Sequence, residues 1–574
     1  MHRRVQRARA TGVCNGPCNG RLLRRRATVR GHNPLLYLAR PASHAANIRA
    51  AARHRERVGC AQFLYAFGFD GSEATNGWGM AQGQGRQARN GSQGGPRAAG
   101  WLRRWSAVAL MGLAGTALAQ PTPQAGMPAK LAAAWRDAKL PDDALSVVVQ
   151  EINGPRLLSL NAKTPRNPAS VMKLVTTWAA LSELGPNYVW RTEFLTDPGN
   201  RPDAHGALAG PLYLRASGDP QFLLQDMWTL LRELRLRGVK QINDLVIDRS
   251  IFGQVATDPG AFDGAPDRAY NASPDALMVG FGAVRLLFTP DPVAHKWVGV
   301  VDPPLPGLRL EGAVEWSDVR CPGPPVVSTD PVVTQQGMSL RLKGKVAGSC
   351  GEFSLYRLAL SQQDYADAVL RMLWRELGGT FKGKVRTGMV PTDAVPLASH
   401  ESPTLGEAIR VINKRSNNVM ARTVLLTLGA ERGRRPATVA TSEAVAKQIL
   451  NEQGLSMPEL VIDNGAGLSR EARVSAESLA SLLTVAWQSP VMPEFIASMA
   501  IAGVDGTVRR RLKGNGAAGM AHLKTGSLRD VRAIAGYVLG ASGKRFVVVS
   551  IVNHDNAAAV RAFDDALVAW LAEQ

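Results

Sequence analysis

The feature that most constrains the fold of this chain is the wide spacing of three short polar motifs. They are SVMK at 170–173, SNN at 416–418 and KTG at 524–526, and about 240 residues separate the first from the second. Any one of them occurs by chance in a chain this long, whereas the ordered triple rarely does. If the motifs form one site, residues 125–205 and 396–574 build one discontinuous domain, and the residues between leave that domain and return to it.

Ser170 and Lys173 lie three residues apart, which places them on one face of a helix. A serine hydroxyl is a weak nucleophile and needs a base close by. The residues after Lys173 are mostly apolar, which predicts a buried helix where desolvation and a nearby cation lower the pKa of the lysine. The pair predicts a nucleophile and its base. Taken alone, the pattern fits a buried helix start better, with a lysine that reaches the surface.

The second motif lies in a break between two helical stretches, Leu405 to Ile412 and Val419 to Leu425. Ser416 can relay a proton between Lys173 and a leaving group. Asn418 can orient that lysine and bond a substrate amide. Taken alone, an ordinary polar turn or helix N-cap explains the motif better, because Ser and Asn are the residues expected there.

The third motif precedes two runs typical of strands, residues 531–539 and 546–552. On an edge strand, Lys524 and Thr525 can hold a substrate carboxylate. We expect Gly526 to leave room for a peptide against that strand. A hairpin turn with a solvated lysine explains this motif alone equally well.

Together the motifs predict an enzyme that works through a covalent acyl-serine. The oxyanion that develops during acyl transfer needs two donors, and the backbone amides of Ser170 and Ser527 are the candidates. We expect no cofactor and no metal, because Cys14 and Cys18 alone, without a second pair nearby, are a weak metal-binding signal.

With these motifs the chain resembles the D-alanyl-D-alanine carboxypeptidase/endopeptidase family of class C, low-molecular-mass penicillin-binding proteins. The resemblance runs from about residue 125 to the C-terminus, with two departures. Ala466 stands where the family has a serine, and residues 279–282 lack the polar side chains expected after the Ala-Ser-Pro turn at 272–274. The segments that match, besides the three motifs, are the P-A-S sequence at 168–170, the G-D-P turn at 218–220, the N-G-x-G-L-S-R loop at 464–470 and the D-G-T sequence at 505–507.

The resemblance implies an α/β (α+β) penicillin-binding, transpeptidase-like fold with a large insertion between the first and second motifs. It implies a serine-type D-Ala-D-Ala carboxypeptidase or DD-endopeptidase that acts on peptidoglycan peptides ending in D-Ala-D-Ala and is acylated by β-lactam antibiotics. It also implies at most peripheral contact with a membrane. A nucleic-acid-binding protein would rest only on the basic N-terminus, and loss of that segment on export would remove this alternative, so we expect no nucleic-acid partner. Two alternatives remain: an exported wall-binding protein of the same fold with little turnover, and a β-lactamase, although the sequence offers no positioned carboxylate to activate a water.

The insertion has a mixed α and β character of its own. We expect residues 206–291 and 351–395 to form an inserted α+β domain, with a β-rich subdomain at 292–350 nested within it. The expected elements are strands at 214–217, 245–248, 286–289 and 297–301 and helices at 222–237 and 363–377, each helix closed by a glycine.

The first 119 residues have a different composition from the rest, with 19 Lys and Arg against 3 Asp and Glu. Residues 1–100 are therefore predicted to be disordered or an over-extended reading frame. Residues 101–119 have the basic, apolar and Ala-x-Ala regions of a signal peptide, which predicts export to the periplasm. Cleavage before Gln120 would leave two cysteines, Cys321 and Cys350, and in an oxidising compartment this even number predicts a disulfide.

Overall fold

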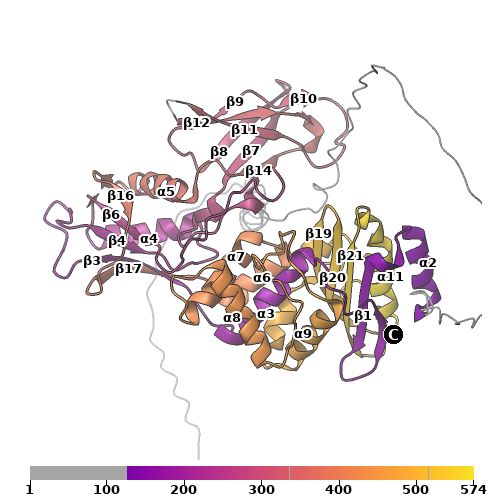
Figure 1. Cartoon of the computed structure of the whole chain (residues 1–574). Coiled ribbons are helices and arrows are strands. Elements are labelled where there is room, and N and C mark those ends of the chain that lie inside the picture. Colours follow the sequence, from indigo (N-terminus) through magenta and orange to yellow (C-terminus); the bar gives the residue numbers. More distant parts are fainter. Residues whose placement is uncertain (1–125, 335–336, 515) are drawn as a thin grey trace, which may run out of the picture. The chain divides into compact units, whose positions relative to one another are not determined.

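All three motifs lie in a part of the chain built around a six-stranded antiparallel sheet (Figure 1). The structure is a computed structural model that describes residues 126–334, 337–514 and 516–574, so the predictions for residues 1–119 lie outside the described residues. The strand order is β18 (Ala500–Ile501), β19 (Ala521–Leu528), β20 (Val531–Leu539), β21 (Arg545–Asn553), β1 (Leu145–Glu151) and β2 (Arg156–Leu160).

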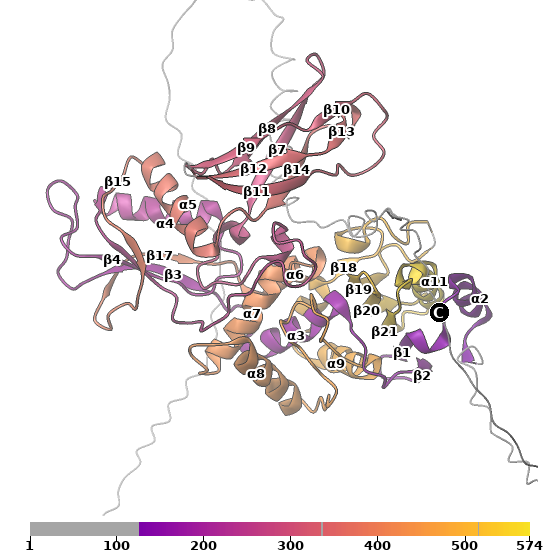
Figure 2. The same cartoon turned by 45° about the horizontal axis from the view of Figure 1, so that its top comes forward.

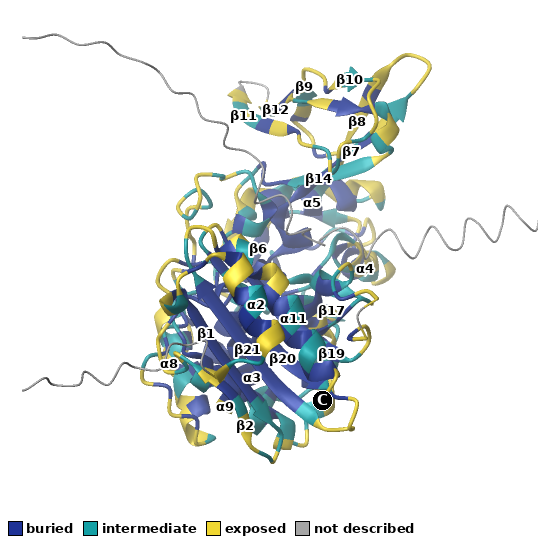
Figure 3. Ribbon diagram, turned by 90° about the vertical axis from the view of Figure 1, so that its right-hand side faces the viewer, coloured by how far each residue is buried: buried dark blue, intermediate teal, exposed yellow. Residues whose placement is uncertain are grey.

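Both faces of this sheet are covered, which explains why β20 and β21 have almost continuous apolar sequences. Val147 and Val548 pack with α2 (Ala129–Ala138) and α11 (Arg561–Ala572) on one face. Figure 3 shows α2 and α11 over that face. Val148 and Val549 pack into the helical cluster on the other face. The predicted strands at 531–539 and 546–552 are thus confirmed, the second with one extra residue at each end.

The helical layer surrounds a central helix, α3 (Met172–Leu184), which begins directly after Ser170. Its first ten residues are all buried, because helices contact it from several sides. The helix therefore lies in the core and holds the first motif at the centre of the domain. The neighbouring helices are α6 (Leu405–Arg415), α7 (Asn418–Glu431), α8 (Val439–Glu452) and α9 (Ala476–Gln488).

The insertion is built on a second sheet of five strands, covered by two helices that pack on each other (Figure 2). Its two outermost strands at one edge, β3 (Arg191–Thr196) and β17 (Val395–Glu401), come from ranges that we expected in the catalytic part. They pair with the insertion instead, because Phe194 and Ala398 pack into its apolar core. The other elements are β4 (Leu212–Arg215), β6 (Leu245–Asp248), β16 (Val385–Thr387), α4 (Leu224–Leu236) and α5 (Gln362–Glu376).

A β-rich region lies within the insertion, between β6 and α5. Cys321 and Cys350 form a disulfide there, with Cα atoms 4.9 Å apart. Among the described residues, no helix is long and apolar enough to cross a membrane. The strands of this region are β7 (Val284–Asp291), β8 (Lys296–Asp302), β9 (Leu308–Glu311), β10 (Glu315–Ser317), β11 (Ser328–Thr334), β12 (Gly337–Lys343), β13 (Lys345–Ala347) and β14 (Phe353–Arg357).

Candidate active site

Ser170 lies in a tight 3₁₀ turn, η3 (Ala169–Val171), that leads straight into α3. Ala169 has a φ of 46°, a left-handed conformation that costs energy for an alanine. The side chain of Asn167 accepts a hydrogen bond from the Ala169 amide at 2.9 Å and donates one to the Ser469 carbonyl at 2.8 Å. These bonds hold the strained turn in place and so fix the position of the serine.

Lys173 is fully buried and its Nζ lies among three oxygens. The distances are 2.9 Å to Ser170 Oγ, 2.6 Å to Asn418 Oδ1 and 2.6 Å to the Ala466 carbonyl. Burial, followed by the nearby Lys524 and Arg422, lowers the pKa of Lys173 well below its ordinary value. A lysine with a lowered pKa that touches a serine hydroxyl has the geometry of a base beside its nucleophile.

In the second motif, one residue has a structural role and the other two lie in the site. Asn417 is the N-cap of α7, since its side chain accepts a hydrogen bond from the Met420 amide, so the N-cap interpretation is correct for this residue. Ser416 ends α6 with a φ of 59°, and its Oγ lies 2.9 Å from Lys524 Nζ. Asn418 opens α7 beside Lys173. The turn therefore presents one polar group to each of the two buried lysines.

The third motif lies on β19, next to an incomplete sheet edge. β18 pairs with β19 only through Leu523 and His522, so within the described residues no strand pairs with that side of β19 from Lys524 onward. Such an edge can accept an extended peptide as an additional strand. Ser527 is exposed along this edge, where an incoming peptide can reach its amide.

Lys524 is also fully buried, and its Nζ donates to the Thr525 carbonyl at 2.8 Å besides contacting Ser416. Burial lowers the pKa of Lys524 to about 7. The Thr525 hydroxyl lies 2.8 Å from the hydroxyl of Thr507, which belongs to the D-G-T sequence. Two hydroxyls and an ammonium group thus lie at the beginning of the open edge, which suits a carboxylate.

The structure gives a different reason for a glycine at position 526 from the one that the sequence suggested. A Cβ atom at this position would lie 2.4 Å from the Pro168 carbonyl oxygen and 3.2 Å from the Ala169 Cβ. The space beside the glycine is therefore occupied by the turn that holds Ser170, whereas we had expected it to be left for a peptide. Close packing of β19 against this turn brings the first and third motifs together.

Three backbone carbonyl groups contribute to the site and could not be predicted from the three motifs. The backbone carbonyl of Ala466 accepts a hydrogen bond from Lys173. Because every residue has a backbone carbonyl, this contact does not need the serine that the family has at this position. The insertion also reaches the site through carbonyls: Tyr270 accepts from Asn418 at 3.3 Å and Ala272 from Arg422 at 3.1 Å. The absence of polar side chains at 279–282 therefore does not separate the insertion from the site. Arg422 could have been predicted from the sequence, because it lies four residues after Asn418 in a helix and so on the same face.

The site thus combines a buried lysine base, a serine on a fixed turn, a second buried lysine and an open strand edge. This set fits acyl transfer from a peptide that ends in a carboxylate. Within residues 126–334, 337–514 and 516–574, no cluster of three or more His, Cys, Asp or Glu side chains could hold a metal ion.

Known proteins share this sequence and fold over most of the chain. The family model described as D-Ala-D-Ala carboxypeptidase 3 (S13) matches residues 127–574. The D-alanyl-D-alanine carboxypeptidase of Actinomadura sp. (strain R39) is 30% identical over 462 residues, which cover 76% of this chain and 84% of that protein. The D-alanyl-D-alanine carboxypeptidase DacB of Haemophilus influenzae is 27% identical over 420 residues, which cover 72% of this chain and 86% of that protein.

Solved structures agree with the fold. The crystal structure of penicillin binding protein 4 (dacB) from Haemophilus influenzae superposes with a TM-score of 0.63 at 24% identity, covering 78% of this chain and all of that one. A second structure of that protein, in complex with a β-lactam, gives a TM-score of 0.61 at 25% identity, with the same coverage. The mixed α and β fold, with its insertion, is therefore shared with these proteins.

Proposed function

The chain belongs to the D-Ala-D-Ala carboxypeptidase 3 (S13) family, and on that premise we propose that it cleaves peptidoglycan peptides through an acyl-enzyme formed on Ser170. As a member of this family it is a serine-type D-Ala-D-Ala carboxypeptidase, a hydrolase. The observation that best supports the assignment to Ser170 is the contact of its hydroxyl with a buried, pKa-lowered Lys173 that Asn418 and Ala466 also hold.

The first step transfers the Ser170 proton to neutral Lys173 while the oxygen attacks the carbonyl carbon of the penultimate D-alanine. The amides of Ser170 and Ser527 receive the oxyanion. As the amide bond breaks, Ser416 passes its proton to the departing nitrogen and receives in turn the proton that Lys173 took from Ser170, which leaves Lys173 neutral again. Lys524 stays protonated and donates a hydrogen bond to Ser416. Water then attacks the acyl-serine and restores the hydroxyl.

Substrate recognition is proposed at the open edge of β19, where the peptide would add as an extended strand. Lys524 and Thr525 would hold the terminal carboxylate, with the hydroxyl of Thr507 beside them. A β-lactam presents a carboxylate and a strained amide in a similar arrangement, so we expect penicillin to acylate the same serine. Both stem peptides and cross-links are candidate substrates, which covers carboxypeptidase and endopeptidase activity.

We further propose that residues 101–119 are a signal peptide and that the enzyme works in the periplasm. Periplasmic export would bring the chain to its peptidoglycan substrate and to an oxidising compartment suited to the disulfide between Cys321 and Cys350. For the domain boundaries, sheet membership supports a catalytic domain made of about 126–190 and 402–574, with the insertion between them.

The test measures D-alanine release from a peptide that ends in D-Ala-D-Ala, alongside penicillin hydrolysis. We expect release from the peptide and slow turnover of penicillin. Ser170→Ala should abolish release, whereas Ser542→Ala, at an exposed serine outside the site, should not. Fast penicillin hydrolysis without peptide cleavage would favour a β-lactamase, and binding without turnover would favour a wall-binding protein.

A further inference from the structure

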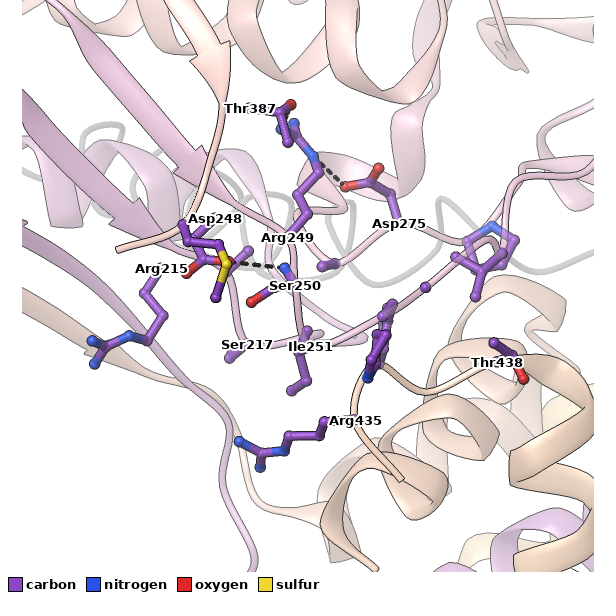
Figure 4. Close-up of a pocket in the computed structure, with 18 of the residues that line it drawn as sticks. Arg215, Ser217, Asp248, Arg249, Ser250, Ile251, Asp275, Thr387, Arg435 and Thr438 are labelled. Carbon is purple, nitrogen blue, oxygen red and sulfur yellow. Dashed lines mark hydrogen bonds and ion pairs between the residues drawn. The ribbon is translucent and has the colours of Figure 1, made fainter. Parts of the chain in front are cut away.

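A cavity of about 1280 Å³ lies away from the three motifs, none of which lines it (Figure 4). Its walls come from the five-stranded sheet of the insertion and from the loop between α7 and α8. This volume exceeds that of a typical site for one small molecule and suits a peptide of several residues. The arrangement of its walls indicates a binding site.

The cavity lies at the carboxyl ends of three parallel strands. β4, β6 and β16 run parallel to one another. The residues that end or directly follow them line the cavity, namely Arg215 to Ser217, Asp248 to Ala256 and Thr387 to Met389. In open α/β sheets, ligands bind in the crevice outside the carboxyl ends of the strands, because the loops there converge.

Buried polar groups hold these loops in place. Asp248 is largely buried and accepts hydrogen bonds from the amides of Ser250 and Val390, which joins the loops after β6 and β16. Arg249 pairs with Asp275 at 3.0 Å, with the two side chains only 11% and 12% exposed, and reaches Thr387 at 3.3 Å. The loops around the cavity are therefore built from fixed contacts, as a preorganised site requires.

The opposite wall belongs to the catalytic part. The loop after α7 joins the insertion through paired backbone hydrogen bonds: the Gly253 amide donates to the Ala437 carbonyl at 2.8 Å, and the Ala437 amide to the Ile251 carbonyl at 2.9 Å. Glu431, the last residue of α7, lines the cavity, and Asn418, the first, contacts Lys173. Fourteen residues at 1.5 Å each place the cavity about 20 Å from that end of the helix.

Two guanidinium groups offer donors to a ligand in this cavity. Arg215 is 44% and Arg435 56% exposed, and Figure 4 shows both side chains extending on the same side. Each pairs with one carboxylate, Arg215 with Glu193 at 3.1 Å and Arg435 with Glu431 at 2.8 Å. Exposed pairs of this kind contribute little and leave several of the five N–H groups of each arginine to bind a second carboxylate.

We propose that this cavity is a second binding site for peptidoglycan, which holds a stem peptide by its carboxylates while another stem occupies the active site. The proposal rests on the proposed function, since it takes the polymer as the substrate. A polymer with many identical peptides can occupy two sites of one enzyme at once, which raises the effective concentration at the catalytic site. The cavity would therefore favour cleavage of intact peptidoglycan over cleavage of short peptides.

The test uses the full chain acylated with penicillin, so that the active site is already occupied. A fluorescent pentapeptide ending in D-Ala-D-Ala is the probe, and its binding is followed by anisotropy. We expect the acylated protein to bind the probe and the double variant Arg215→Gln, Arg435→Gln to bind it roughly tenfold or more weakly, since two charge-assisted contacts are lost. The same variant should release D-alanine from a short peptide at the normal rate and from intact peptidoglycan more slowly.

Two further variants separate the cavity from general charge effects. Arg309→Gln with Arg320→Gln removes the same charge from exposed positions that do not line the cavity, and should leave binding unchanged. Ser250→Trp places a bulky side chain in part of the cavity without changing charge, and should weaken binding as the arginine variant does. No binding to the acylated protein, or equal binding by the wild type and both cavity variants, overturns the proposal.

If the proposed function were wrong, the experiment would give a different result from failure of the second site. It would show as absence of penicillin acylation and of D-alanine release. Probe binding would then be compared between the unacylated wild type and the cavity variants, where equal affinities again overturn the second site.

Discussion

Gly526→Ala distinguishes the structural account of the third motif from the simpler interpretation that the glycine leaves room for a peptide. The new Cβ would lie 2.4 Å from the Pro168 carbonyl oxygen, and such atoms do not approach within 3.0 Å. The turn that holds Ser170 must therefore move by about 0.6 Å or more. Misplacement of a reacting group by about 1 Å costs about 100-fold in rate, so we expect acylation to fall between roughly 10-fold and 100-fold.

The assay compares two reactions of the same variant: acylation by fluorescent penicillin and D-alanine release from a peptide. Displacement of the nucleophile slows both reactions by a similar factor. Gly406→Ala is the matched control, since its Cβ would meet its nearest neighbour, the Pro186 carbonyl, at an ordinary 3.4 Å. A variant that is acylated by penicillin at the normal rate but cleaves peptide slowly would refute the reasoning, because only room for the peptide would then have been lost.

Three further predictions concern charge and stability. Lys173 acts as a base only when neutral, so kcat/KM should rise as pH passes upward through its lowered pKa. Arg422→Gln removes a cation that lowers this pKa and should move that limb of the profile to higher pH, whereas Arg422→Lys should not. A structural role for Arg422 alone would instead reduce the rate at every pH. Lys524 binds a carboxylate only when protonated, so kcat/KM for peptides should fall above pH about 7, and a flat profile from pH 6 to 9 would contradict this. Replacing both Cys321 and Cys350 by alanine opens a loop with a sequence separation of 29 and should lower the stability of the nested region by roughly 3–4 kcal/mol in denaturant melts, while D-alanine release at 25 °C stays within about twofold.

Much of the fold could be predicted from local sequence patterns. The predicted helices at 222–237 and 363–377 correspond to α4 and α5, because an apolar face and a closing glycine define both. The edges of the insertion could not be located in this way. β3 and β17 lie next to each other in one sheet although about 200 residues separate them, and nothing local in either segment shows which core it joins.

The site was predictable where its chemistry depends on side chains and unpredictable where it depends on the backbone. Ser170, Lys173 and Asn418 could be proposed from their residue types and spacing. The carbonyls of Ala466 and Tyr270 could not, since every residue has one and only the fold decides which lies beside a lysine or an amide. The left-handed conformation of the residue before the nucleophile was equally hidden, because alanine rarely adopts it.

The measurement that tests the central claim most directly is mass spectrometry of the protein after reaction with penicillin. The intact mass should increase by one penicillin molecule, and digestion should locate the adduct on the peptide that contains Ser170. Ser170→Ala should show no increase while it keeps the melting temperature of the wild type. An adduct on any other peptide, or an unchanged adduct in the variant, would contradict the assignment of the nucleophile.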